Sequence, residues 1–124
     1  MDPKILVVDD ALDSWQLLST ILRNHRYQPI WAADGIQAMS EARKHQPRAI
    51  LLDLGLPGGD GFVVLERLKG NRLLSGIPVI VVTVQDPQVA EQKAKEYGAM
   101  AFLRKPVKAD ELIATVRSAL ESQS

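Results

Sequence analysis

Five polar residues that could take part in chemistry follow short apolar runs of this 124-residue chain. They are Asp9 and Asp10 after Ile5–Val8, Asp53 after Ala49–Leu52, Thr83 after Val79–Val82, and Lys105 after Met100–Leu103. In an open parallel sheet, ligands bind at the edge formed by the carboxyl ends of the strands. If these runs are parallel strands, all five side chains meet at one edge and form one site.

Phosphoryl transfer is the chemistry that these residue types favour. Carboxylates held close together repel one another unless they are protonated or neutralised. Mg²⁺ prefers oxygen ligands and completes its shell with water and phosphate oxygens. Lys105 adds a positive point charge suited to a phosphate oxygen, and Thr83 adds a hydroxyl donor. An aspartate beside a metal and a lysine can attack phosphorus. We therefore predict that Asp53 is a phosphoacceptor, without a role for His25 or His45.

Each of these residues has a simpler interpretation when it is taken alone. A pair of aspartates after a strand is usually a turn or a helix cap, and a threonine commonly ends a strand. Lys105 before Pro106 is also typical of an exposed loop. Independent coincidences would rarely place all five in this order at the ends of apolar runs, so their combination favours a functional site.

The apolar runs themselves indicate a parallel sheet. Runs that are apolar at every position are typical of central parallel strands covered by helices on both faces. Three runs have this character and two are weaker: Ile5–Val8, Ala49–Leu52 and Val79–Val82, then Pro29–Ala32 and Met100–Leu103.

Segments with a helical period separate the runs. Asp34 is a plausible cap for a helix over Gly35–Lys44, and Asp86 followed by Pro87 is a strong helix start. Gly70-Asn71 and Gly98 are expected to end helices. Alternating strands and helices predict an α/β fold with a doubly wound sheet. The expected apolar stripes are Leu17, Leu18, Ile21 and Leu22, then Phe62, Leu65 and Leu68, then Leu112, Ile113, Val116 and Leu120.

Length and composition favour one soluble domain. A chain of 124 residues can bury a single core, which we place at about residues 4–120 before a short polar tail. Fifteen basic residues balance fifteen acidic ones, so no overall field favours nucleic acid or an anionic membrane. The absence of cysteine excludes disulfides and thiolate chemistry. No signal peptide or membrane-spanning run is found in the sequence, and we expect a cytoplasmic protein.

The chain resembles the receiver domains of bacterial two-component response regulators. The resemblance rests on four segments: Ile5–Asp10, Leu51–Pro57, Val82-Thr83 and Phe102–Pro106. It implies a flavodoxin-like fold with strand order 2-1-3-4-5 and phosphorylation of Asp53. It also implies that Asp10 and Asp53 bind Mg²⁺ directly, with Mn²⁺ as an alternative ion. Asp9 would then act through a metal-bound water, the Gly55 carbonyl would complete the protein ligands, and Thr83 and Lys105 would contact the phosphoryl group.

The same resemblance implies a switch and a set of partners. The switch would couple the Thr83 hydroxyl to Phe102, because a threonine drawn towards the phosphoryl group vacates space that a ring can fill. The phosphoryl donor would be a sensor histidine kinase or a histidine phosphotransfer protein. The output would be a downstream protein or a fused domain. Its docking face would be formed by the helix starting after Asp86, the last strand and the last helix, with no direct nucleic-acid binding.

Three residues near the acceptor depart from, or vary within, the family pattern. Val84 stands where the family usually has a small side chain, so its branched bulk is expected to narrow access to Asp53. Gly55 and Gln85 occupy positions that tune self-dephosphorylation in the family. Gly55 cannot hold a water with a side chain, whereas Gln85 could orient one. We predict slow intrinsic phosphorylation and a moderately long-lived phosphoryl state.

Two other functions compete with this interpretation. Phosphatases of the haloacid dehalogenase type also use an aspartate nucleophile and Mg²⁺, but they place an acidic residue two positions later. Gly55 occupies that position here, and no cap domain is evident. The second alternative is a binding module with the receiver fold that no longer takes phosphate. Retention of Asp10, Asp53 and Lys105 argues against it. We therefore do not expect a turnover enzyme.

Overall fold

A computed structural model describes residues 2–56 and 61–122. Pro57, which belongs to the motif after the third strand, and the end of the polar tail lie outside this range. Strands and helices alternate along the described residues, as predicted. The elements are β1 (Lys4–Val8), α1 (Leu12–Asn24), β2 (Gln28–Ala32), α2 (Gly35–His45), β3 (Ala49–Leu52), α3 (Gly61–Gly70), β4 (Val79–Thr83), α4 (Pro87–Glu96), β5 (Ala101–Arg104) and α5 (Ala109–Glu121).

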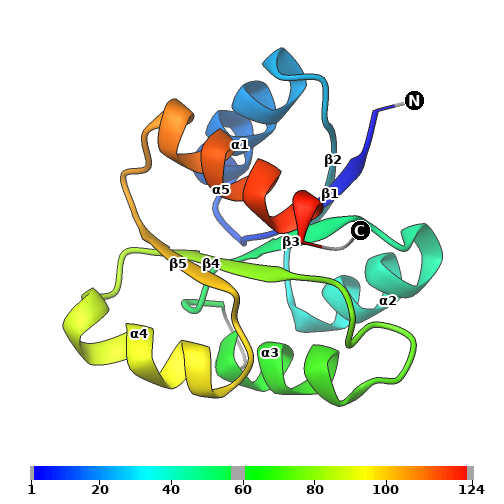
Figure 1. The fold of residues 1–124 in the computed structure, drawn as a ribbon, viewed down its shortest axis with the longest axis vertical. Coiled ribbons are helices and arrows are strands. Elements are labelled where there is room, and N and C mark those ends of the chain that lie inside the picture. Colours follow the sequence, from blue (N-terminus) through cyan, green and yellow to red (C-terminus); the bar gives the residue numbers. More distant parts are fainter. Residues whose placement is uncertain (1, 57–60, 123–124) are drawn as a thin grey trace.

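The strands form one parallel sheet at the centre of the molecule (Figure 1). Among the described residues the sheet has five strands in the order β2-β1-β3-β4-β5, which confirms the predicted order and the flavodoxin-like class. The chain adds β2 on one side of β1 and β3 on the other. This reversal makes the carboxyl ends of β1 and β3 a topological switch point, where such folds bind ligands.

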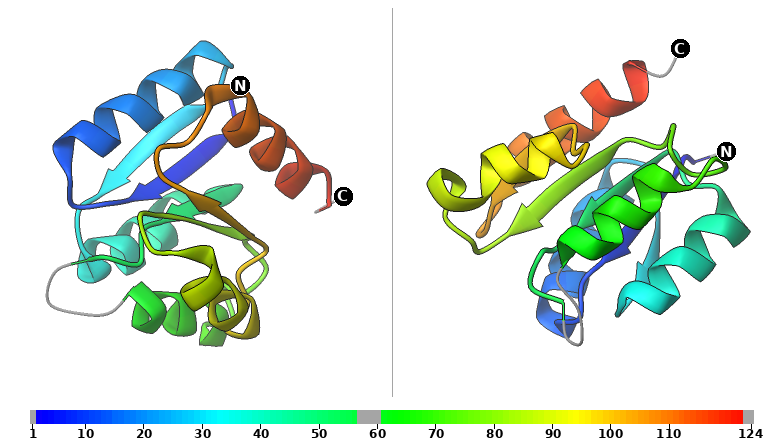
Figure 2. Two further views of the ribbon diagram at one scale, coloured as in Figure 1. Left: turned by 90° about the vertical axis from the view of Figure 1, so that its left-hand side faces the viewer. Right: turned by 90° about the horizontal axis from the view of Figure 1, so that it is seen from below.

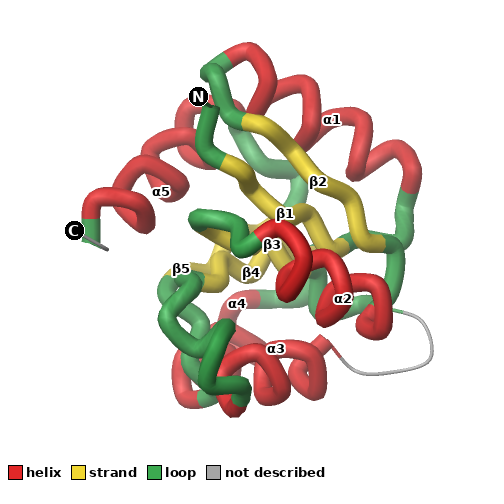
Figure 3. The backbone as a smooth tube through the Cα atoms, turned by 90° about the vertical axis from the view of Figure 1, so that its right-hand side faces the viewer, coloured by secondary structure: helices red, strands yellow, loops and turns green. Residues whose placement is uncertain are grey.

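Helices cover both faces of the sheet and create two cores. Helices α1 and α5 lie on one face, and α2, α3 and α4 lie on the other (Figures 2 and 3). The side chains of β3 alternate between the two cores: Leu51 packs with the α1–α5 face and Leu52 with the α2–α4 face. All four residues of β3 are buried, because a central parallel strand is covered on both sides.

Most local expectations match the structure, although some strand bounds shift by one residue and one apolar position differs. Asp34 caps α2 by accepting a hydrogen bond from the Gln37 N–H at 2.8 Å. The last strand begins at Ala101, one residue later than predicted. Leu17 was expected in the apolar stripe of α1, but half of its surface is exposed. Leu17 instead borders a groove beside Lys105, because its position on α1 faces the loop after β5 rather than the sheet.

Across the described parts of the chain, no helix combines the length and the apolarity needed to cross a bilayer.

Candidate functional site

The sheet itself fixes the backbone of the predicted site residues. Asp9 follows β1 and Asp53 follows β3, and the Asp53 N–H still donates to the Val8 carbonyl at 2.9 Å. Lys105 follows β5, and its N–H donates to the Thr83 carbonyl at 2.8 Å. The hydrogen-bond ladder therefore extends into the site. Its rigidity places residues from four strand ends at one edge, as the sequence predicted.

The acidic residues form a cluster that fits a hard cation. Carboxylate oxygens of Asp9, Asp10 and Asp53 all lie within 4.8 Å of one another. Asp9 is buried, Asp53 is partly buried and Asp10 is exposed, so the cluster opens to solvent on one side. Oxygen donors at such spacing are the ligand type that Mg²⁺ prefers. The donor set is therefore suited to Mg²⁺ or Mn²⁺.

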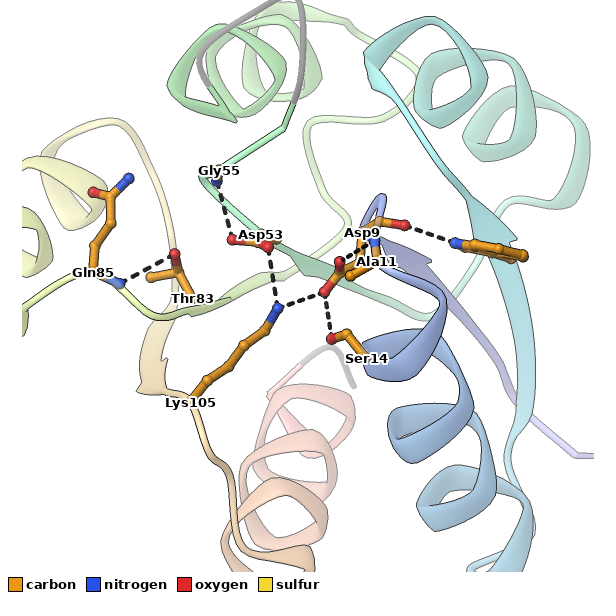
Figure 4. Close-up of polar contacts among 9 residues, drawn as sticks. Asp9, Ala11, Ser14, Asp53, Gly55, Thr83, Gln85 and Lys105 are labelled. Carbon is orange, nitrogen blue, oxygen red and sulfur yellow. Dashed lines mark hydrogen bonds and ion pairs between the residues drawn. The ribbon is translucent and has the colours of Figure 1, made fainter.

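Lys105 connects two of these carboxylates (Figure 4). Its Nζ lies 2.7 Å from Asp9 Oδ2 and 3.1 Å from Asp53 Oδ2, so one ammonium bridges the ends of β1 and β3. Burial lowers the pKa of Lys105, but hydrogen bonds and charge attraction from Asp9 and Asp53 outweigh it and raise the pKa above its usual value. Lys105 therefore stays charged. Three carboxylates against this single ammonium leave a negative site that attracts a cation.

Asp9 is held by more groups than the sequence predicted. Its Oδ2 accepts a hydrogen bond from Ser14 Oγ at 2.5 Å, and its Oδ1 accepts one from the Ala11 N–H at 2.9 Å. The Asp9 carbonyl accepts a third from the Trp31 indole at 2.7 Å. Sequence reasoning did not include Ser14 or Trp31 in the site. The sequence contained a weak signal for Ser14, because the start of the helix after Asp9 faces the same edge of the sheet as the site. It contained no such signal for Trp31.

The loop after Asp53 turns back on the Asp53 carboxylate. Asp53 Oδ1 accepts a hydrogen bond from the Gly55 N–H at 3.0 Å, which orients the carboxylate. Gly61 begins α3 directly against this segment. A Cβ on Gly61 would lie 2.4 Å from the Leu54 Cα and 2.7 Å from the Asp53 carbonyl oxygen. Only glycine fits there, so the entry to α3 and the position of Asp53 depend on each other.

Thr83 and Phe102 lie on the same face of the sheet. Val81 pairs with Phe102 and Thr83 pairs with Arg104, so the alternation of side chains directs Thr83 and Phe102 towards the α3–α4 side. Thr83 is fully buried, and its Oγ1 accepts a long hydrogen bond of 3.5 Å from the Gln85 N–H. Phe102 is only partly buried, at the margin of that core.

Val84 and Gln85, the two residues that follow Thr83, differ in their surroundings. Val84 is 69% exposed and borders an apolar groove of about 360 Å³ beside Lys105. The groove is otherwise lined by Asp13, Ser14, Leu17, Leu18, Pro106 and Val107. The Gln85 amide lies apart from the Asp53 carboxylate in Figure 4. A role for Gln85 in orienting water at Asp53 therefore requires its side chain to rotate.

Comparison with known proteins agrees with this fold. The family model described as the response regulator receiver domain matches residues 5–117. Sporulation initiation phosphotransferase F of Bacillus subtilis is 36% identical over 124 residues, covering 100% of this chain and 98% of the relative. The chain belongs to the response regulator receiver domain family of two-component systems. Members of this family are signalling domains, and they interact with histidine kinases or phosphotransfer proteins.

Two further similar proteins are informative, one for the length of its chain and the other for a bound magnesium ion. The DNA-binding response regulator MtrA of Mycobacterium tuberculosis is 36% identical over 120 residues, which are 97% of this chain but 51% of that protein. The receiver domain of a sensor histidine kinase from Pseudomonas aeruginosa has a similar structure, with a TM-score of 0.89 and 26% identity. The two chains are covered to 98% and 99%, respectively. That structure contains a magnesium ion coordinated in its active-site cleft.

Proposed function

We propose that this protein is a phosphorylation switch in which Asp53 accepts a phosphoryl group in the presence of Mg²⁺. The observation that carries the proposal is the cluster of three carboxylates within 4.8 Å, bridged by Lys105. A negative site of this kind gains free energy by taking up a cation. The magnesium ion in the similar receiver domain from Pseudomonas aeruginosa adds support.

Different ligand roles are proposed for the three aspartates. Asp10 and Asp53 would bind Mg²⁺ directly, together with the Gly55 carbonyl. The two carboxylate oxygens of Asp9 already accept three hydrogen bonds, from Ala11, Ser14 and Lys105. This occupancy supports an indirect role for Asp9, through a metal-bound water. When bound, the ion supplies positive charge that neutralises the oxygens of the transferring group.

The chain's own residues would accomplish the rest of the transfer. An Asp53 oxygen attacks phosphorus, the bond from phosphorus to the donor's histidine nitrogen breaks, and the bonding electron pair leaves with that nitrogen. The product is an acyl phosphate on Asp53. Lys105 and the Thr83 hydroxyl would contact the phosphoryl oxygens. Because the Lys105 ammonium already contacts Asp53 at 3.1 Å, it needs little movement to reach a phosphoryl group there.

The signal would leave the site through Thr83 and Phe102. Their side chains share one face of neighbouring strands, and Phe102 is only partly buried. This placement supports the proposed exchange, in which Thr83 moves towards the phosphoryl group and Phe102 turns inward. The face formed by α4, β5 and α5 would then bind the downstream partner.

The rates of phosphorylation and dephosphorylation would depend on Gly55, Val84 and Gln85. Val84 borders the groove beside Lys105, which supports an effect on the approach of the phosphodonor. Gly55 contributes its backbone N–H to Asp53 and no side chain. We propose slow phosphorylation and a phosphoryl state that lasts longer than seconds.

The proposed donor is a sensor histidine kinase or a histidine phosphotransfer protein in the cytoplasm. Residues 1–124 would act as one receiver domain, without direct contact to nucleic acid or membrane. Its output is either a separate protein or a fused domain. Both arrangements have precedents in the relatives, since one is matched over nearly its full length and another over about half.

Phosphorylation can be tested with acetyl phosphate and MgCl₂, followed by intact-protein mass spectrometry. We expect the wild type to gain one phosphoryl group, Asp53→Ala to gain none, and the reaction to require Mg²⁺. Asp2→Ala is the matched control, because Asp2 precedes β1 at the opposite edge of the sheet.

Three results would contradict the proposal. Phosphorylation of Asp53→Ala would place the acceptor elsewhere. Absence of phosphorylation in the wild type, together with no response of the amide resonances to beryllofluoride and Mg²⁺, would favour a module that has lost the switch. Continuous multiple turnover of small phosphate esters would instead favour a phosphatase.

A further inference from the structure

Asp9 and Asp10 form an acidic turn after β1. The indole of Trp31, which lies on the neighbouring strand β2, contacts the backbone of this turn. We infer that Trp31 is a positioning residue for the cation site, an inference that rests on the proposed function. Trp31 Nε1 donates to the Asp9 carbonyl oxygen at 2.7 Å. This hydrogen bond goes to the backbone and not to a carboxylate, so its effect on the cation would pass through the peptide that joins Asp9 to Asp10.

That peptide lies just beyond the end of β1, within the acidic turn. The Asp9 N–H donates to the Ala32 carbonyl at 3.0 Å, and the Asp9 carbonyl accepts from Trp31. Both peptide groups that flank the Asp9 Cα are therefore bound by β2. Because a peptide unit is planar, fixing the Asp9 oxygen also fixes the direction of the Asp10 N–H and the position of the Asp10 Cα. Trp31 thus constrains the backbone from which two of the three carboxylates extend.

The donor is itself held rigidly. The rings of Trp31 and Trp15 are stacked, with centroids 5.3 Å apart and an interplanar angle of 3°. The Arg23 guanidinium carbon lies 5.8 Å from the centroid of the Trp15 ring, within the range of a cation–π contact. Trp15 packs against the core on the α1–α5 face. A ring held by stacking can aim its N–H at one acceptor with little loss of side-chain entropy on binding a ligand.

A purely structural role makes a different prediction from a positioning role. If Trp31 only covers the edge of the sheet, the ring matters and the N–H does not. If Trp31 positions the turn, the N–H matters for cation affinity even where the ring is kept. Groups that orient metal ligands through hydrogen bonds typically change metal affinity by about 10–100-fold when they are removed.

The first experiment compares Trp31→Phe with the wild type by titrating MgCl₂ alone and following backbone amide resonances. Phenylalanine keeps an aromatic ring against Trp15 but removes the donor. We expect Mg²⁺ affinity to fall by about 10-fold. Tyr27→Phe is the matched control, because it also removes one polar hydrogen from an aromatic ring, and Tyr27 precedes β2 at the opposite edge. Its Mg²⁺ affinity should equal that of the wild type.

An unchanged Mg²⁺ affinity in Trp31→Phe would overturn the role of Trp31 but leave the proposed metal site intact. An equal loss in Tyr27→Phe also overturns it, since the effect would then come from general weakening of the α1–β2 region. Absence of any Mg²⁺-dependent shift in the wild type would overturn the proposed metal site together with this inference. The two failures are therefore distinguishable.

A second measurement uses the wild type and does not depend on whether the variant folds. We expect the Trp31 indole N–H resonance to shift during the MgCl₂ titration with the same midpoint as the Asp53 and Gly55 amides. The reason is that cation binding at the turn alters the carbonyl that accepts this hydrogen. A Trp31 indole resonance that stays fixed while those amides shift would overturn the inference.

Discussion

At the scale of single residues, the site combines groups that oppose folding with groups that compensate for them. Asp9, Asp10 and Asp53 bring three negative charges within 4.8 Å, and their mutual repulsion costs free energy in the metal-free protein. Lys105 offsets part of this cost by pairing with Asp9 and Asp53. Such a departure from the most stable arrangement is typical of functional sites. We therefore expect cations to change the stability of the protein.

Replacement of Asp10 by asparagine tests this balance. Asp10→Asn removes one repelling charge from the exposed side of the cluster, so we expect a higher unfolding temperature than the wild type without Mg²⁺. Saturating Mg²⁺ should stabilise the wild type, by about 2.7 kcal/mol at a concentration 100 times the dissociation constant. Asp10→Asn should lose most of this gain. Thermal unfolding with and without MgCl₂ measures both effects.

Asp2→Asn serves as the control for charge removal away from the cluster. We expect it to keep the Mg²⁺-dependent stabilisation of the wild type. A lower metal-free stability of Asp10→Asn, combined with an intact response to Mg²⁺, would contradict the proposed repulsion and the ligand role of Asp10.

At the scale of elements, α4 packs against the rest of the fold through small side chains. It buries only Ala90 and Ala94 among its described residues, and small side chains contribute little apolar burial. Its start is instead stabilised by Asp86, whose carboxylate accepts from the Gln88 N–H at 3.0 Å, and by Pro87 in the first turn. A helix that buries little apolar surface but has a stabilised start can change its position at a low cost in free energy, as the proposed output face requires.

Replacement of Asp86 by alanine should weaken α4 selectively. Loss of the cap is expected to reduce the free energy of unfolding by about 1 kcal/mol. Amide hydrogen exchange should accelerate more in α4 than in α5, because α4 has little core packing to compensate. Asp34→Ala removes the equivalent cap of α2 and should leave exchange in α4 unchanged. Equal acceleration in every helix of Asp86→Ala would show that α4 is not a separate weak element.

At the scale of the whole molecule, one sheet supports two cores. Leu51 and Leu52 are adjacent on β3, are both buried, and face opposite sides of the sheet. Asp53 follows them directly, so the packing of both cores determines where its carboxylate lies. The consequence is that the two cores should not unfold independently, because β1, β3 and β4 contribute side chains to each.

Truncation on each face tests this coupling. Leu51→Ala and Leu52→Ala should each reduce the free energy of unfolding by about 2–5 kcal/mol, because each leaves a cavity in a closely packed core. Urea unfolding should remain a single transition in both variants. Leu73→Ala provides the control, since Leu73 is mostly exposed and should change stability by no more than about 0.5 kcal/mol. Two separate transitions in either core variant would indicate that the two cores fold independently.

The sheet edge that carries the candidate site could be predicted from the sequence for a physical reason. Hydrophobic period and strand length are local properties, and Asp9, Asp53 and Thr83 stand directly at the ends of apolar runs. Capping by Asp34 and Asp86 was predictable for the same reason, because a cap acts within three residues of itself. The roles proposed for Gly55, Val84 and Gln85 stay predictions, since they concern rates.

Taken by itself, the sequence determined the alternation of strands and helices and the residues that follow the strands, because these depend on neighbours along the chain. Only the tertiary structure decided which groups pair. Lys105 bonds Asp9 across 96 positions and Asp53 across 52, and Trp31 reaches the Asp9 carbonyl from the next strand. Such contacts depend on strand register, helix packing and side-chain direction. None of these leaves a periodic pattern in the sequence, so the bridge by Lys105 and the support from Trp31 emerged only in three dimensions.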